Sequence, residues 1–170
     1  MTPRAKRRQR GQAVVEFTLI AIPMIFILIS TTEMARGMWN YQTLAVGVRA
    51  GARFAAAHGQ GCSQNGNSCA VTVSDVAHSI ATGSVGMVPA DMNVVLSSAT
   101  AASVTCSPLS NCYGNGAMWP PAADNAPGKN ITIQGTWTFK SALAMYWPGH
   151  GAVKFGTFTF GAWTKQPILF

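Results

Sequence analysis

The longest apolar stretch of the chain lies between residues 13 and 32. Between Glu16 and Glu33 there are 16 consecutive uncharged residues, and Ala13 to Val15 extend the apolar stretch on its N-terminal side. A helix needs ~20 predominantly apolar residues to cross the ~30 Å hydrocarbon core of a bilayer. We therefore predict one transmembrane helix over residues 12–33. No other stretch of the sequence is long enough for a second span.

The helical pattern continues beyond the predicted span. Residues 34–57 contain no proline, and apolar residues recur there at the three- and four-residue intervals of one helix face. We predict that the helix runs to about His58-Gly59, so that residues 34–59 continue the span and lay an apolar face on a globular domain. That face consists of Tyr41, Leu44 or Ala45, Val48, Ala52 and Ala55.

Residues 60–170 carry the shorter periodic segments of a small α+β domain. A short amphipathic helix is predicted at about residues 74–82, with Ser74 or Asp75 as its cap. Residues 107–129 hold four prolines and three glycines and are predicted to form a long loop.

Alternating apolar and polar residues predict strands in the same domain. Residues 92–96 and 102–106 indicate either two strands or one long bent strand, and two further strands are predicted at 131–140 and 153–163. In the last strand the apolar residues fall at odd positions up to Phe155 and at even positions from Phe158 on, which predicts a bulge at Gly156-Thr157. One polar face per strand is typical of an antiparallel sheet. The predicted fold class is α+β: a long transmembrane helix that continues into a small domain with an antiparallel sheet.

The charge of the chain is concentrated at its N-terminus. The formal net charge is +7, from 12 Lys and Arg against 5 Asp and Glu, and five of the basic residues fall within the first ten positions. The other seven basic residues and the five acids leave a net charge of only +2 for residues 12–170. Basic residues directly before an apolar helix keep the N-terminus in the cytoplasm. Residues 1–11 are therefore predicted to be a basic cytoplasmic leader, the rest beyond the span is exported, and no nucleic acid partner is expected.

The four cysteines all follow the span and fall as two close pairs. Exported thiols meet an oxidising environment, so two disulfides are predicted in the domain of residues 60–170. Local pairing is the simplest of the three possible connectivities, because each pair brackets a run rich in turn-forming residues. The predicted pairs are Cys62 with Cys69 and Cys106 with Cys112.

Small residues recur four apart on the exported part of the helix, at Gly47, Gly51 and Ala55. Glycine lowers helix propensity by up to ~1 kcal/mol relative to alanine, so a compensating contact is expected. Such a stripe lets another element approach closely. Two interpretations remain open: the stripe faces the protein's own sheet, or it packs against another subunit.

Neither a catalytic constellation nor a cofactor motif is evident. The three histidines are far apart in sequence, no His-Glu-x-x-His occurs, and no glycine-rich phosphate loop follows a strand. The segment Thr82-Gly83-Ser84-Val85-Gly86 lacks the first glycine of a nucleophile elbow. The cysteine spacings also lack the close pairs of structural zinc modules. We expect neither an enzyme nor a metal or cofactor site.

A short motif lies where the basic leader meets the apolar helix. Gly11 is followed by Gln12, and Glu16 and Phe17 are the fifth and sixth residues after the glycine. This arrangement resembles the type IV prepilin signal. Together with the arginine- and alanine-rich segment at residues 48–56, it resembles the TadE-like pseudopilins of tight-adherence (Tad) pilus systems over about residues 8–58.

The resemblance implies a pilin-like protein that matures by proteolysis. A prepilin peptidase on the cytoplasmic side would cut after Gly11 and leave Gln12 as the N-terminus. The product would be a minor pilin or pseudopilin of the inner membrane that takes part in assembling or priming a Flp-type pilus used for adherence. The resemblance is also compatible with a location in the pilus itself. The implied partners are the peptidase, pilin and pseudopilin subunits, the inner-membrane assembly platform and membrane lipid.

Two residues of the motif are assigned to assembly. Glu16 is the only ionisable residue inside the apolar segment, and we interpret it as setting the register with a neighbouring subunit. Phe17 stands where the major subunits of these pili commonly have tyrosine, and 170 residues is far longer than such subunits. Both departures favour an accessory subunit.

Two other functions remain open from the sequence. Cleavage by a signal peptidase near Ser30-Thr31-Thr32 would release a secreted disulfide-bonded domain. Alternatively, the span is a plain signal anchor in which Gly11 and Glu16 are incidental. The mature N-terminus distinguishes all three.

Overall fold

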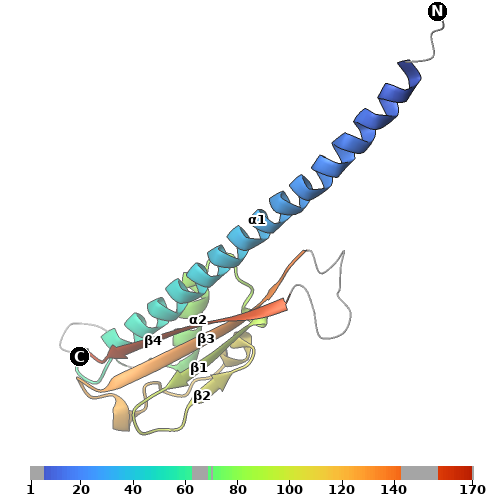
Figure 1. The fold of residues 1–170 in the computed structure, drawn as a ribbon. Coiled ribbons are helices and arrows are strands. Elements are labelled where there is room, and N and C mark those ends of the chain that lie inside the picture. Colours follow the sequence, from blue (N-terminus) through green and yellow to red (C-terminus); the bar gives the residue numbers. More distant parts are fainter. Residues whose placement is uncertain (1–5, 63–68, 70, 143–156, 170) are drawn as a thin grey trace, which may run out of the picture. The chain divides into compact units, whose positions relative to one another are not determined.

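A computed structural model describes residues 6–62, 69, 71–142 and 157–169, with side chains from residue 11 onward. The chain divides into two compact units, Met1–Gly37 and Met38–Phe170, and each is described by itself. The fold is α+β (Figure 1). Its elements are α1 (Lys6–Ala57), α2 (Val73–Gly83), β1 (Met92–Ser97), β2 (Val104–Cys106), β3 (Asn130–Lys140) and β4 (Thr157–Pro167), with short 3-10 turns at Pro89–Asp91, Leu109–Cys112 and Ala122–Asp124.

Helix α1 is a single element of 52 residues with one internal proline, Pro23. It ends at Ala57, and the His58 N–H then turns back to the Ala55 carbonyl at 3.2 Å. The predicted end at residues 58–59 is therefore one to two residues too late, within the usual variation of helix boundaries. The predicted continuation of the helix beyond residue 33 is confirmed.

The four strands form one antiparallel sheet in the order β2-β1-β3-β4 (Figure 1). Residues 92–106 form two strands rather than one bent strand, because β1 and β2 pair with each other through Val95 and Thr105. β4 pairs with β3 along its whole length, from Thr157 opposite Lys140 to Pro167 opposite Asn130. The predicted start of this strand at Val153 and the Gly156 side of the predicted bulge lie outside the described residues.

The part of α1 that belongs to the unit Met38–Phe170 packs on the sheet at a glycine. Leu44 and Val48 are buried, and a Cβ added to Gly135 of β3 would lie 2.7 Å from Val48 Cγ2 and 3.1 Å from Leu44 Cδ1. Glycine at this position lets the helix approach the strand more closely than any side chain would allow. Ile131 and Ile133 on the same face of β3 are fully buried and extend the core.

Helix α2 begins with a capping box that places its cap before the predicted one. Thr72 is the N-cap: its hydroxyl accepts from the Asp75 N–H at 3.2 Å, and the Asp75 carboxylate accepts from the Thr72 N–H at 2.9 Å. The prediction of Ser74 or Asp75 as the cap is therefore wrong. Thr-x-x-Asp is a reciprocal pattern that satisfies two otherwise unpaired N–H groups, and Ser74 instead donates its hydroxyl to the Tyr113 carbonyl.

Both disulfides join cysteines close in sequence. Cys62 pairs with Cys69 and Cys106 with Cys112, with Cα atoms 5.6 Å apart in each pair. Cys106 ends β2 and Cys112 ends the following 3-10 turn, and both are buried. The second disulfide therefore ties the edge of the sheet to the turn that follows it.

Asp124 is a buried carboxylate that holds two loops together. It accepts hydrogen bonds from the Thr100 hydroxyl at 2.7 Å, from the Thr100 N–H at 2.7 Å and from the Ala101 N–H at 3.0 Å. The Thr100 hydroxyl is the largest cause that keeps the pKa of Asp124 below its ordinary value, followed by the Thr100 N–H. These bonds favour the charged form, so the carboxylate stays ionised although it is buried.

Asp124→Asn is expected to lower the thermal stability of the unit Met38–Phe170, because the amide has no negative charge and its nitrogen cannot accept from the Thr100 hydroxyl, while its oxygen is a weaker acceptor for the Thr100 and Ala101 N–H groups. The folded-state pKa of Asp124 is lowered, so the stabilisation is present above the ordinary aspartate pKa and is lost as the pH falls through the folded-state value. Unfolding followed by fluorescence between pH 7 and pH 2 measures this. A variant with the stability and acid sensitivity of the wild type would contradict the role of Asp124.

Candidate membrane and assembly site

The predicted cleavage motif lies on the first described turns of α1. Gly11, Gln12, Glu16 and Phe17 are all exposed, with 72% of Phe17 accessible, and a Cβ at Gly11 would meet no atom within 4 Å. The Gln12 side-chain amide donates to Glu16 Oε1 at 3.2 Å, one helical turn away. The structure therefore brings Gln12 and Glu16 together on one helix face and leaves the segment around Gly11 open.

The stretch after Glu16 exposes its large apolar side chains along the whole predicted span. Leu19, Ile22, Phe26 and Ile29 are between 38% and 71% exposed. By length and composition, α1 is the one helix among the described residues that is able to cross a membrane. Exposed apolar side chains are stable in contact with lipid, whereas in water they would form an unusually large apolar surface.

Hydroxyl side chains in this stretch are satisfied within the helix. Thr18 donates to the Val15 carbonyl at 2.9 Å, and Ser30 donates to the Phe26 carbonyl at 2.8 Å. An unsatisfied hydroxyl would be costly in hydrocarbon, where no water is available. These local bonds make the polar residues of the stretch compatible with a bilayer.

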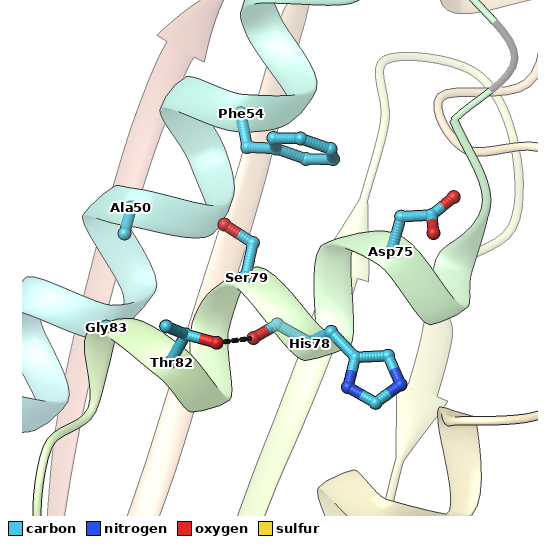
Figure 2. A pocket seen from close by; sticks show the side chains of 7 residues that line it. All are labelled: Ala50, Phe54, Asp75, His78, Ser79, Thr82 and Gly83. Atoms are coloured by element: carbon cyan, nitrogen blue, oxygen red, sulfur yellow. Dashed lines mark hydrogen bonds between the residues drawn. The ribbon is translucent and has the colours of Figure 1, made fainter.

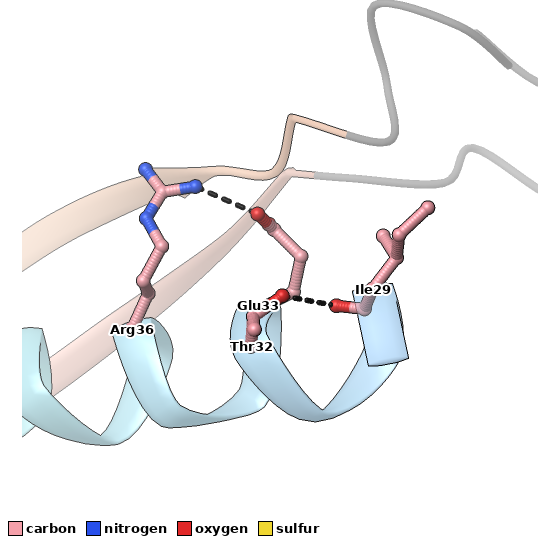
Figure 3. A network of polar contacts seen from close by, with 4 residues as sticks. All are labelled: Ile29, Thr32, Glu33 and Arg36. Carbon is pink, nitrogen blue, oxygen red and sulfur yellow. Dashed lines mark hydrogen bonds and ion pairs between the residues drawn. The ribbon is translucent and has the colours of Figure 1, made fainter. Parts of the chain in front are cut away.

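The C-terminal end of the apolar stretch carries a polar network (Figure 3). Figure 3 shows the Thr32 hydroxyl turned back to the Ile29 carbonyl, at 2.8 Å, and Arg36 reaching Glu33, with Nη1 and Oε1 2.7 Å apart. The first ion pair after the apolar run thus begins at Glu33, the predicted end of the span. Charged groups are expensive inside hydrocarbon, so the position of this pair is consistent with the predicted end of the span.

The small-residue stripe packs inside its own chain. A Cβ at Gly47 would overlap Ser84 Oγ and lie 2.8 Å from the Ile80 carbonyl oxygen, and one at Gly51 would overlap Ile80. Gly83 closes the contact from the other side, since its Cβ would lie 3.0 Å from the Gly47 Cα. Gly47 and Gly51 therefore contact α2 and its C-cap, Ser84, and the expectation that these two residues face the sheet is wrong. Leu44 and Val48 lie on the neighbouring face of the helix, and they pack on Gly135 of the sheet instead.

Ala55, the third member of the stripe, is fully buried. Within the described residues, the contacts of Gly47 and Gly51 are already occupied by α2, and this packing leaves no room for a second subunit at these two glycines. The compensating contact that their low helix propensity requires is intramolecular.

A shallow groove of about 490 Å³ runs between α1 and α2 (Figure 2). Its titratable residues are engaged elsewhere: Asp75 caps α2, and the His78 ring stacks on Tyr113 with centroids 4.3 Å apart. Hydrogen bonds from Thr72 are the main cause that lowers the pKa of Asp75. The groove is lined by Ala50, Phe54, Asp75, His78, Ser79, Thr82 and Gly83.

The groove does not assemble a nucleophile with a base. In Figure 2, Ser79 points toward Phe54 while the His78 ring points away from it, and the Thr82 hydroxyl donates to the His78 carbonyl at 2.9 Å. Among the residues that the structure describes, no three His, Cys, Asp or Glu side chains gather as metal ligands. The arrangement supports packing of α1 on α2 and offers no hydrogen-bonded catalytic pair.

Sequence reasoning missed two features of the unit Met38–Phe170. The Thr72 cap was detectable, because Thr-x-x-Asp before an amphipathic run is a helix-start pattern. The Asp124 contact with Thr100 was not, because it joins residues 24 apart in two irregular loops. No periodic pattern links such positions.

Comparison with known proteins adds one finding. Residues 11–53 match the family model described as TadE-like protein. Neither a curated protein nor a solved structure matches the chain. The matched segment contains the predicted cleavage motif, the apolar stretch, and Gly47 and Gly51 of the contact with α2.

Proposed function

We propose that this chain, whose residues 11–53 match the family model described as TadE-like protein, is a minor pilin or pseudopilin that takes part in assembling or priming a Flp-type (Tad) type IV pilus. The observation that carries the proposal is the coincidence of this match with the exposed apolar stretch of α1 that follows Gly11 and that holds one carboxylate, Glu16, before Glu33. The role is structural, through contacts with other subunits, and not catalytic.

The proposed topology is a single pass through the inner membrane. The five basic residues before Gly11 hold the N-terminus in the cytoplasm, and the disulfide-bonded domain is exported. The open surroundings of Gly11 suit a protease that needs an unhindered segment. Cleavage there by a prepilin peptidase removes five positive charges that would repel copies brought side by side.

The proposed partners follow from this topology. The peptidase contacts Gly11 and Gln12, the lipid surrounds the apolar stretch, and pilin or pseudopilin subunits with the inner-membrane assembly platform contact the span through Glu16 and Phe17. Phe17 suits such a contact because it is a large ring that is 72% exposed. Gly47 and Gly51 contribute indirectly, by holding the exported domain on the helix.

The mature chain is expected to begin at Gln12 and to keep its span. N-terminal sequencing and intact mass of the protein extracted from membranes measure this, and Gly11→Leu is the variant expected to abolish cleavage. A matched control is Gly116→Leu, since a Cβ at Gly116 also meets nothing within 4 Å. A start near Glu33 would establish the secreted domain, and an uncut chain would establish the plain signal anchor. Either result would overturn the proposed maturation.

A further inference from the structure

Large aromatic side chains are exposed at one end of the exported domain. Trp39 is 64% exposed, Phe158 is 51% exposed and Tyr41 is 47% exposed. Single exposed apolar residues are ordinary on protein surfaces. These three rings, however, lie at the same end of the domain, as the following contacts show.

Two contacts show that β4 and the exported part of α1 run in the same direction. At one end the rings of Tyr41 and Phe160 lie 6.1 Å apart, and at the other the Leu169 N–H donates to the Ala56 carbonyl at 3.0 Å. Phe158 precedes Phe160 by two residues, so it lies toward the N-terminal side of Tyr41.

A lysine lies at the same end as these rings. Lys140 is paired with Thr157, the residue before Phe158, and its side chain is 71% exposed. Its ammonium lies 3.9 Å from Asp91 Oδ1, a long ion pair between two exposed groups. Such a pair holds weakly, and the exposed ammonium is therefore accessible to another anion.

The few residues between Glu33 and Trp39 in the sequence keep this end near a bilayer surface. Trp39 and Tyr41 follow Glu33 by six and eight residues of one helix, which is about 9 and 12 Å. The headgroup region adds only about 5–8 Å to each side of the hydrocarbon core. Long helical side chains lean back toward the helix N-terminus, which makes up part of the difference between this thickness and the distance of Trp39 and Tyr41 from Glu33. Trp and Tyr favour this layer because each combines an apolar ring with a polar group.

We propose that Trp39, Tyr41, Phe158 and Lys140 form a membrane-docking end, with which the exported domain rests on the headgroups of the bilayer that anchors the chain. The rings enter the interfacial layer, and Lys140 contacts lipid phosphates by extending its apolar stem along the surface. The inference rests on the membrane anchoring in the proposed function and is independent of the role in pilus assembly.

Spin-label accessibility of the full-length chain in nanodiscs tests the proposal. The nanodiscs contain phosphatidylethanolamine and phosphatidylglycerol, and the labels are carried by Thr159→Cys, Lys165→Cys and Ile25→Cys. Thr159 and Lys165 are both exposed on β4, about 20 Å apart along the strand. The label at position 159 is expected to collide several-fold less with a water-soluble nickel complex, relative to oxygen, than the label at position 165.

Variants of exposed residues then separate docking from folding. Trp39→Gln and Lys140→Gln are each expected to raise nickel accessibility at position 159, whereas Trp163→Gln, at an equally exposed ring on β4, leaves it unchanged. Equal accessibility at positions 159 and 165, with position 25 protected, would overturn the docking and keep the anchor. Nickel accessibility at position 25 as well would overturn the anchoring, and with it the proposed topology.

Discussion

Glu16→Ala is expected to abolish surface pili and co-purification with pilin partners while membrane insertion and cleavage continue. A carboxylate at the centre of a bilayer costs about 2.5–3.5 kcal/mol on insertion scales, and less near the interface. Glu16 lies near one end of the apolar stretch, five residues after Gly11. Removing it therefore changes insertion of the single helix only slightly.

The carboxylate matters more once spans pack together. Neighbouring helices exclude water, and a buried carboxylate then needs a partner. In the free chain Glu16 accepts from the Gln12 amide at 3.2 Å, a neutral donor that satisfies one of its oxygens. Cleavage after Gly11 creates a cationic α-amine at Gln12, and a subunit shifted along the axis can bring its amine alongside this Glu16. Such a pair favours one stagger between subunits over others.

Two measurements check this expectation. Piliation is counted by electron microscopy, and cleavage is measured by the intact mass of the membrane-extracted variant. Gln12→Ala is the matched control, because it removes the intrachain donor to Glu16 but keeps the carboxylate and the new amine. Normal piliation by Glu16→Ala would contradict the hypothesis that Glu16 sets the register between subunits. Failed cleavage would assign Glu16 to recognition by the peptidase.

Gly47→Val is expected to destabilise the unit Met38–Phe170 by at least about 2 kcal/mol, since overpacking forces neighbouring groups to move. Already the first added carbon overlaps Ser84 Oγ and lies 2.8 Å from the Ile80 carbonyl oxygen. The Ser84 hydroxyl can rotate away, but the Ile80 carbonyl belongs to the α2 backbone and gives way only if α2 moves away from α1. The added methyl groups extend the overlap.

Urea unfolding of the full-length chain in detergent, followed by tryptophan fluorescence, measures the effect. Trp119 is 2% exposed and reports on the core of the domain. Gly116→Val is the matched control, because a Cβ there meets nothing within 4 Å and the backbone does not have positive φ. Equal unfolding midpoints for Gly47→Val and the wild type would show that α2 does not pack on Gly47 in the protein.

The residues of the N-terminal half determined much of this protein without a structure. One long helix follows from three features: the apolar run between Glu16 and Glu33, the basic leader before it, and the helical stripe without proline after it. Each of these features can be recognised from residues that are neighbours in sequence, because helix periodicity and the length needed to cross a bilayer both concern one continuous segment. The match of residues 11–53 to the TadE-like family lies in this same stretch. Alternation at residues 131–140 predicted β3 for a similar reason, since one face of the strand is buried and the other is exposed.

Tertiary structure decided which surfaces meet. The spacing of Gly47 and Gly51 shows that an element must approach closely, but a stripe of small residues is equally compatible with a sheet, a helix or another subunit. Only the fold shows that α2 occupies it and that Gly135 receives Leu44 and Val48. The Asp124 contact and the common end of Trp39 and Phe158 depend on residues far apart in sequence, and long-range pairing leaves no periodic pattern in the chain. The sequence alone thus determined the long apolar helix and the motif at its start, whereas the packing of the unit Met38–Phe170 required the structure.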